Sequence, residues 1–206
     1  MSVATDGTQG DQYSELPALT ADGRYVAFVS WATNLTPGDS NGAADVFVKD
    51  RQTGALERVS VAADGDQANA ASGERTSGAL ARPNMSTSPR AGNPKGTSVQ
   101  TRDTGLLSLR PGLSADGQYV AFTTSASNLT LGDANARDDV LVKDRLDGGI
   151  ERISVAADGS DADAASSYAA LSADGRYVAF ASPARNLVAG DTNERWEVFV
   201  AERGHP

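Results

Sequence analysis

Cysteine is absent from the 206-residue sequence, and histidine occurs once, as His205. Without cysteine, the chain has no disulfide bond, thiolate metal site or cysteine nucleophile. His205 is next to the last residue, where chain ends fray, whereas a Ser-His-Asp triad needs a base held by buried partners. We therefore predict that the chain is not an enzyme, with no catalytic residue and no organic cofactor.

Long apolar runs are also lacking. No stretch approaches the roughly 20 residues of a membrane-spanning helix, and residues 1–10 do not have the pattern of a signal peptide. We expect a soluble chain with no membrane insertion. If the parent protein is secreted, its export signal has been removed or lies upstream.

Positive charge is scarce, with 18 Lys and Arg against 27 Asp and Glu and a net charge of −9. An acidic chain is poorly suited to neutralise phosphates, so we expect no nucleic-acid partner. The one compact basic stretch runs from Arg82 to Arg102, and we interpret it as a solvated loop rather than a phosphate site.

A repeated phrase is the main feature that the sequence does have. Leu19–Phe28 returns as Leu113–Phe122 and as Leu171–Phe180, each followed by Asn-Leu, Gly-Asp-x-Asn, an acidic residue and a Val-rich run. The copies are 94 and 58 residues apart. The extra 36 residues lie between Ser72 and Leu113, because the first two copies are otherwise in step. A repeat of this size indicates stacked modules.

Each copy contains the pattern of a β-hairpin. Ala-Asp-Gly stands between two apolar runs, where Asp and Gly tolerate the positive φ of a tight turn. Asp22, Asp116 and Asp174 are therefore expected to form turns rather than a set of catalytic carboxylates. The Tyr-Val-Ala-Phe run that follows is typical of a strand buried on both faces.

Three further strands complete each unit. A short strand at Pro17–Leu19 or Ala169–Leu171 precedes the hairpin, and Asp45–Val48, with its equivalents, follows it. The alternating segments Leu56–Ala62 and Ile150–Ala156 suit a half-exposed outer strand.

Four antiparallel strands per unit, repeated radially, predict an all-β fold of the β-propeller class. Ser2–Gly7 repeats the phrase Ser60–Gly65, which the third copy lacks. We therefore expect the N-terminal strand, Ser2–Ala4, to complete the C-terminal blade. Residues 1–206 form a single propeller domain or a propeller segment, with residues 73–112 as an irregular insert or an eroded blade.

The phrase Leu-Ser-Ala-Asp-Gly-Arg-Tyr-Val-Ala-Phe, followed by Asn-Leu-x-x-Gly-Asp-x-Asn and Asp-Val-Phe-Val-Lys-Asp-Arg, resembles the TolB-like β-propeller repeat family. The resemblance covers Ser2–Ser72 and Leu113–Arg203. It implies an extracytoplasmic scaffold, periplasmic or secreted, that binds proteins or other ligands on its top face or in its central channel. It implies no reaction, because a fold carries over more reliably than a function.

The number of blades is open at this point, since propellers usually have about 4–8. The insert could hold an eroded blade, because Val99–Leu107 resembles Val48–Leu56. The chain could instead be a segment of a larger propeller, or two copies could combine as a homodimer with a six-blade ring.

Acidic loops are the best candidates for a chemical site. Each has Asp-x-Asn and an acid six residues after the first Asp, and alternate side chains of a tight loop can converge on Ca²⁺. The alternative is that Asp and Asn hold an Asx turn. The tentative calcium ligands are Asp39, Asn41, Asp45, Asp133, Asn135, Asp139, Asp191, Asn193 and Glu197.

Three functions remain after these considerations. The first is a non-enzymatic scaffold that recognises a protein or glycan. The second is a calcium-stabilised structural repeat module of a larger secreted protein. A glycosidase or peptidase-associated propeller is disfavoured, because the acids recur in every repeat instead of forming one unique pair. Trp31 and Trp196 break the repeat, and we expect them to pack locally rather than to anchor a ligand.

Overall fold

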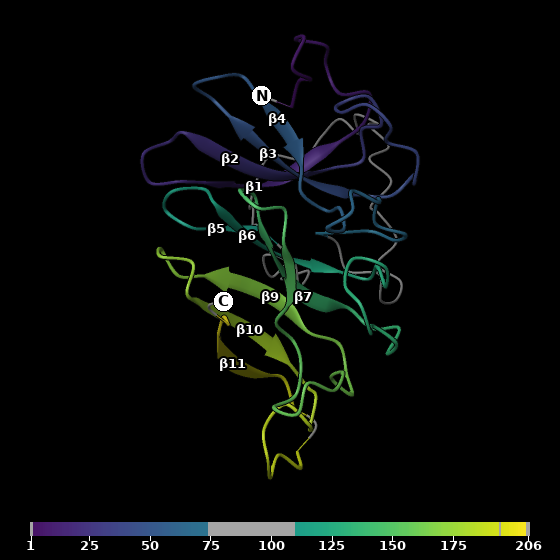
Figure 1. Cartoon of the computed structure of the whole chain (residues 1–206), viewed down its shortest axis with the longest axis vertical. Coiled ribbons are helices and arrows are strands. Elements are labelled where there is room, and N and C mark those ends of the chain that lie inside the picture. Colours follow the sequence, from purple (N-terminus) through teal and green to yellow (C-terminus); the bar gives the residue numbers. More distant parts are fainter. Residues whose placement is uncertain (1, 74–109, 194, 205–206) are drawn as a thin grey trace, which may run out of the picture.

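Three antiparallel sheets, stacked one after another along the long axis of the molecule, make up the fold (Figure 1). The structure is a computed structural model that describes residues 2–73, 110–193 and 195–204. Within these residues it is all-β, and it contains no helix that could cross a membrane.

The strands of the first sheet are β1 (Ser14–Leu19), β2 (Tyr25–Ser30), β3 (Asp45–Asp50) and β4 (Leu56–Arg58). Those of the second are β5 (Gly112–Leu113), β6 (Tyr119–Thr124), β7 (Asp139–Asp144) and β8 (Ile150–Arg152). Those of the third are β9 (Ser167–Leu171), β10 (Tyr177–Ser182) and β11 (Glu197–Glu202). Neighbouring strands in the first two sheets follow chain order, as in a propeller blade, which confirms the predicted four-stranded unit.

The Asp-Gly turns are built as predicted. Asp22 Oδ1 accepts hydrogen bonds from the backbone N of Arg24 at 2.9 Å and from the Thr20 hydroxyl at 2.6 Å. Gly23 then takes a φ of 71°, which glycine adopts without strain. Asp116 and Asp174 make the same bonds in their own turns, so all three carboxylates serve the hairpins.

The insert interrupts the first strand of the second sheet. Ser72 bridges to Thr124 of β6, and Gly112 pairs with Ala121 of the same strand. In the first sheet the equivalent stretch of β1 contains a β-bulge, so the insertion falls where the ladder is already irregular. The predictions made for residues 74–109, an eroded blade and a basic loop, lie outside the described residues.

Burial follows the stacking of the sheets. All six residues of β3 are buried, and so are most of those of β2, β6 and β7, which confirms the buried strands predicted for the repeat. In β11, which has nearly the same residues as β3, intermediate and exposed residues alternate. The first two sheets are each followed by another sheet, whereas β11 belongs to the last one.

A tyrosine and a glycine form the joint between the first and second sheets. The Tyr25 ring lies against Gly117, and a Cβ at Gly117 would overlap the ring. Arg145 of the second sheet lies over the same ring, with its Cζ 5.0 Å from the ring centroid. Arg145 also donates to Glu57 Oε2 at 2.8 Å. This ion pair links the fourth strand of the first sheet to the second sheet.

The second joint repeats the first. Tyr119 packs on Gly175, and the Arg203 Cζ lies 4.0 Å from the centroid of the Tyr119 ring. Arg203 donates to Glu151 Oε2 at 3.2 Å. An open groove of about 380 Å³ is lined by these joint residues, so it is a by-product of stacking.

The N-terminal segment corrects one prediction. The backbone O of Val3 accepts a hydrogen bond from Lys49 Nζ at 3.2 Å, so residues 2–10 lie against the first sheet instead of completing the third. Lys143 makes the equivalent bond to Val61 O at 3.1 Å. The phrase shared by residues 2–7 and 60–65 is therefore a linker that docks on the sheet that follows it. The third sheet has three strands among the described residues.

The asparagine of each Asn-Leu pair fastens these linkers. Asn128 donates to Gln67 O at 2.7 Å and accepts from the backbone N of Asn69 at 2.9 Å. Asn34 and Asn186 make the same two bonds to the linkers that precede their own sheets. The sequence shows this asparagine in every copy, but its partner lies in another repeat.

Candidate functional site

The three Asp-x-Asn loops lie between the second and third strands of their sheets. In the first loop, Asn41 Oδ1 accepts a hydrogen bond from the backbone N of Ala43 at 2.9 Å. Asn135 Oδ1 and Asn193 Oδ1 each accept the equivalent hydrogen bond from the backbone N two residues later in the chain, at 2.8 Å in both loops. The Asx turn that we weighed against a metal site is therefore present in all three loops.

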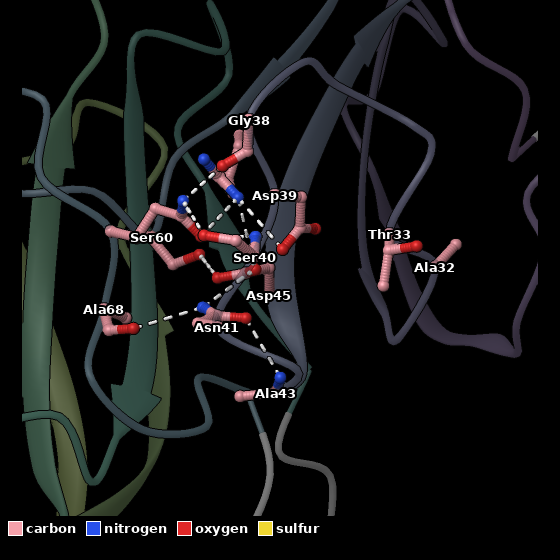
Figure 2. A network of polar contacts seen from close by, with 12 residues as sticks. Ala32, Thr33, Gly38, Asp39, Ser40, Asn41, Ala43, Asp45, Ser60 and Ala68 are labelled. Atoms are coloured by element: carbon pink, nitrogen blue, oxygen red, sulfur yellow. Dashed lines mark hydrogen bonds and ion pairs between the residues drawn. The ribbon is translucent and has the colours of Figure 1, made fainter.

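An arginine from the fourth strand lies among the carboxylates of the first loop. Arg58 Nη1 is 3.3 Å from Asp39 Oδ1 and 3.7 Å from Asp45 Oδ2, and all three side chains are buried. The Ser60 hydroxyl donates to Asp45 Oδ1 at 2.6 Å (Figure 2). The guanidinium thus supplies the positive charge that a metal ion would bring to these oxygens.

The second loop has the same construction. Arg152 Nη1 is 3.5 Å from Asp133 Oδ1, and the Ser154 hydroxyl donates to Asp139 Oδ1 at 2.6 Å. Arg152 also pairs with Asp161, which follows the fourth strand. The arginine was not among our candidate residues, although it recurs in Leu-Glu-Arg and Ile-Glu-Arg.

The third loop has no equivalent of Arg58 or Arg152 among the described residues, because its sheet has no fourth strand there. Asn193 Nδ2 donates to Glu197 Oε1 at 2.7 Å, and Asp191 Oδ1 accepts from the backbone N of Asn193 at 3.1 Å. The other carboxylate oxygen, Asp191 Oδ2, is buried without a hydrogen-bond partner. Asp39 Oδ1 and Asp133 Oδ1 also lack a hydrogen bond, but each of them has an arginine within 4 Å. In this loop, therefore, no arginine of a fourth strand balances the negative charge of the acids among the described residues.

Burial shapes the electrostatics of the first two loops. It raises the pKa of Asp139 to about 6, although the hydrogen bond from Ser154 acts in the opposite direction. Burial also raises the pKa of Asp45 above its ordinary value, again opposed by a serine hydroxyl. Asp39 and Asp133 have raised pKa values for the same reason, with the nearby arginines opposing the shift.

The proposed calcium ligands are brought together as three separate groups, one for each sheet. No three His, Cys, Asp or Glu side chains form a group suited to a metal ion within residues 2–73, 110–193 and 195–204. Calcium binding by the Asp-x-Asn loops therefore stays a prediction.

The two tryptophans differ in their surroundings. Trp31 packs partly buried against the core cluster of the first two sheets, as expected for a packing residue. Trp196 is 46% exposed, and its ring centroid lies 5.8 Å from that of Tyr168. His205 lies outside the described residues.

The last sheet has an open face that sequence patterns did not predict. We define the open face by Tyr177, Trp196, Val198 and Val200. Val198 and Val200 are 77% and 67% exposed, whereas the equivalent Val46 and Val48 are 0% and 1% exposed in the first sheet. Val46 and Val48 belong to one core cluster with Phe122 of the second sheet. The same residues are thus core in one repeat and surface in another.

No family model and no curated protein matches this chain. Among solved structures it is similar to a putative TolB from Agrobacterium tumefaciens, with 14% identity and a TM-score of 0.44 over 93% of this chain and 45% of that one. The propeller domain of the Trilobed protease from Pyrococcus furiosus has 13% identity and a TM-score of 0.42, over 84% and 35% of the two chains.

A further similar structure is the tricorn protease, with 9% identity and a TM-score of 0.43. The match covers 85% of this chain and 11% of that one. The chain thus spans less than half the length of each of these three structures.

Proposed function

We propose that the chain is a non-enzymatic β-propeller scaffold, from an extracytoplasmic parent protein, that recognises another protein through the open face. The observation that carries the proposal is the exposure of Val198 and Val200, whose equivalents are core residues. Soluble proteins rarely leave contiguous apolar surface uncovered unless it binds something.

The composition of the open face supports protein recognition. Tyr and Trp are favoured at protein interfaces. Trp196 precedes the two valines in the chain, and Tyr177 of β10 pairs with Glu202 at the end of β11. The loop carboxylates offer little for catalysis, because those of the first two sheets are buried and paired with arginine. The resemblance to TolB-like repeats supports the extracytoplasmic location.

Replacing Val198 and Val200 by glutamate tests this function. Peptides are selected on the wild-type chain from a phage-displayed library, and a glycan array is probed in parallel. We expect selected peptides whose affinity falls at least tenfold in the double variant, because two charges would have to be desolvated in the interface. Calorimetric titration measures the affinities.

A matched control separates the open face from apolar surface in general. Leu131 is 100% exposed on the loop that follows β6, so Leu131→Glu adds charge elsewhere and should leave peptide binding unchanged. Equal binding by the double variant and the wild type would contradict the proposal. A chain that selects only glycans would contradict the assignment of a protein partner.

Calcium stabilisation is the second candidate, and one observation favours it at the third loop. Asp191 Oδ2 is buried without a partner, whereas Asp39 and Asp133 already have an arginine within 4 Å. A cation at the third loop would complete the charge balance that those arginines supply elsewhere. We therefore narrow the calcium proposal to Asp191, Asn193 and Glu197.

Calcium titration should then give no more than one bound ion per chain. We expect Asp191→Asn to abolish the heat of binding and any rise in melting temperature, because it removes the charge of the incomplete loop. Asp39→Asn, in the loop already paired with Arg58, should leave the calcium response unchanged. Two or three equivalent sites would contradict the restriction to the third loop.

A further inference from the structure

The outer edge of β11 is unlike the edges of its counterparts. β3 pairs with β4, and β7 pairs with β8, in the same antiparallel register. In that register Arg58 lies opposite Phe47, and Arg152 lies opposite Leu141. β11 is the edge strand of the third sheet, so Phe199, the equivalent of Phe47 and Leu141, faces no such arginine among the described residues.

The side chains beside this edge are acidic, and the fourth strand of the other two sheets supplies an arginine at the equivalent place. In the first two sheets the arginine of the fourth strand lies near the first aspartate of the loop, Asp39 or Asp133. The equivalent residue in the third sheet is Asp191, and its Oδ2 is buried without a hydrogen-bond partner. Glu197 occupies the position of Asp45, the second acid of the pair. This edge therefore carries the same pair of acids as its counterparts but, among the described residues, no arginine from a fourth strand.

A serine adds a second element of recognition. The Ser60 hydroxyl donates to Asp45 and accepts a hydrogen bond from the backbone N of Val46 at 3.1 Å. Ser154 makes the same pair of contacts to Asp139 and Val140. In both sheets the serine follows the arginine by two residues. Glu197 and Val198 stand at the corresponding positions of β11.

We propose that the edge of β11, which is unpaired among the described residues, binds an extended segment of a partner protein with the pattern apolar-x-Arg-apolar-Ser. The segment would add as a fourth antiparallel strand, with its arginine opposite Phe199 and near Asp191, and its serine near Glu197. Backbone bonds along the edge provide the affinity, and the two side chains provide the selectivity. This proposal rests on the recognition function and names the kind of partner.

A partner protein fits this edge better than a second copy of the chain. The two segments of the described chain with this pattern are β4 and β8 with their following serines, and both are already paired in their own sheets. Arg58 and Arg152 are likewise held by buried aspartates. A second copy would have to break one of its own sheets to supply the strand.

A synthetic peptide with the sequence of residues 150–156, Ile-Glu-Arg-Ile-Ser-Val-Ala, tests the proposal on the full chain. We expect saturable binding with one peptide per chain by calorimetry. Trp196, next to Glu197, should report the same titration by fluorescence in a Trp31→Phe variant, since the chain has only two tryptophans.

The arginine contact is isolated by a double-mutant cycle. Replacing the peptide arginine by methionine, which is similar in length, should weaken binding at least tenfold, because charge-assisted hydrogen bonds are among the strongest. Asp191→Asn in the chain should weaken the unmodified peptide by a similar factor and have little further effect on the methionine peptide. Asp39→Asn is the matched control and should not change binding.

The possible failures are distinguishable. If the peptide does not bind, while ligands that depend on Val198 and Val200 do, the strand proposal is overturned and the recognition function stands. Equal affinity of the arginine and methionine peptides would overturn the role of Asp191. Sedimentation would also test for a dimer that forms with rising concentration. If such a dimer forms and the peptide dissociates it, the occupant of the edge is a second copy of the chain, and the proposal of a separate partner is overturned.

Discussion

Replacing Gly117 by alanine should lower the free energy of unfolding by about 3 kcal/mol, whereas the same change at Gly23 should cost only about 1 kcal/mol. Both glycines have a φ of 71° in identical turns, so the backbone strain is the same. The added Cβ at Gly117 would overlap the Tyr25 ring, whereas at Gly23 its nearest neighbour is Arg51 Nη1 at 3.3 Å. The difference between the two losses in unfolding free energy measures how much the contact between Tyr25 and Gly117 contributes to stability.

The tyrosine cannot easily give way to the new methyl group. Arg24 and Arg145 both lie over the Tyr25 ring, at 4.7 and 5.0 Å from its centroid. Urea unfolding, followed by fluorescence and circular dichroism, would measure the three stabilities. Equal losses for Gly117→Ala and Gly23→Ala would show that the contact between the sheets contributes little beyond turn strain.

Replacing Arg58 by methionine should cost about 3 kcal/mol at pH 7, because it leaves the buried carboxylates of Asp39 and Asp45 without their cation. Methionine keeps much of the apolar volume of the arginine stem, so the loss is mainly electrostatic. Arg185→Met is the control. Its ion pair with Asp163 is about half exposed and spans 3.8 Å, so we expect a loss below about 0.5 kcal/mol.

The loss of stability caused by Arg58→Met should depend on pH. Burial raises the pKa of Asp39 and of Asp45 in the folded state above the ordinary value of 3.8. An acid with a raised folded pKa costs stability as the pH rises through that pKa, because the folded state then loses a proton that it holds more tightly. The Arg58→Met variant should therefore lose less at pH 4 than at pH 7. A loss independent of pH would point to packing instead.

Local patterns predicted much of each sheet. The Asp-Gly turns and buried strands follow from neighbouring residues, such as Asp22 with Thr20 and Arg24, so the hairpins and the all-β class could be inferred. The Asp-x-Asn loops were found, and the Asx turns within them span two residues. What escaped prediction was Arg58, because its contact to Asp39 depends on the pairing of β3 with β4.

The docking position of the N-terminal segment could not be predicted from the sequence, for a different reason. Residues 2–7 and 60–65 differ only at Thr5 and Ala63, which shows that the two segments are equivalent, but this likeness does not say on which side of a sheet they dock. Lys49 and Asn34 hold residues 2–10 on the first sheet, and these contacts lie 46 and 25 residues apart in the chain. Such distant hydrogen bonds have no pattern in a single repeat.

By itself, the sequence determined the repeating unit, its turns and the order of its strands, because these depend on short-range backbone preferences and on the alternation of apolar residues. The tertiary structure alone decided which copies of the unit are covered. Val48 and Val200 follow the same Val-Phe in the chain, yet one is 1% and the other 67% exposed. Burial depends on what stacks against a strand, and the neighbouring sheet is supplied by distant residues.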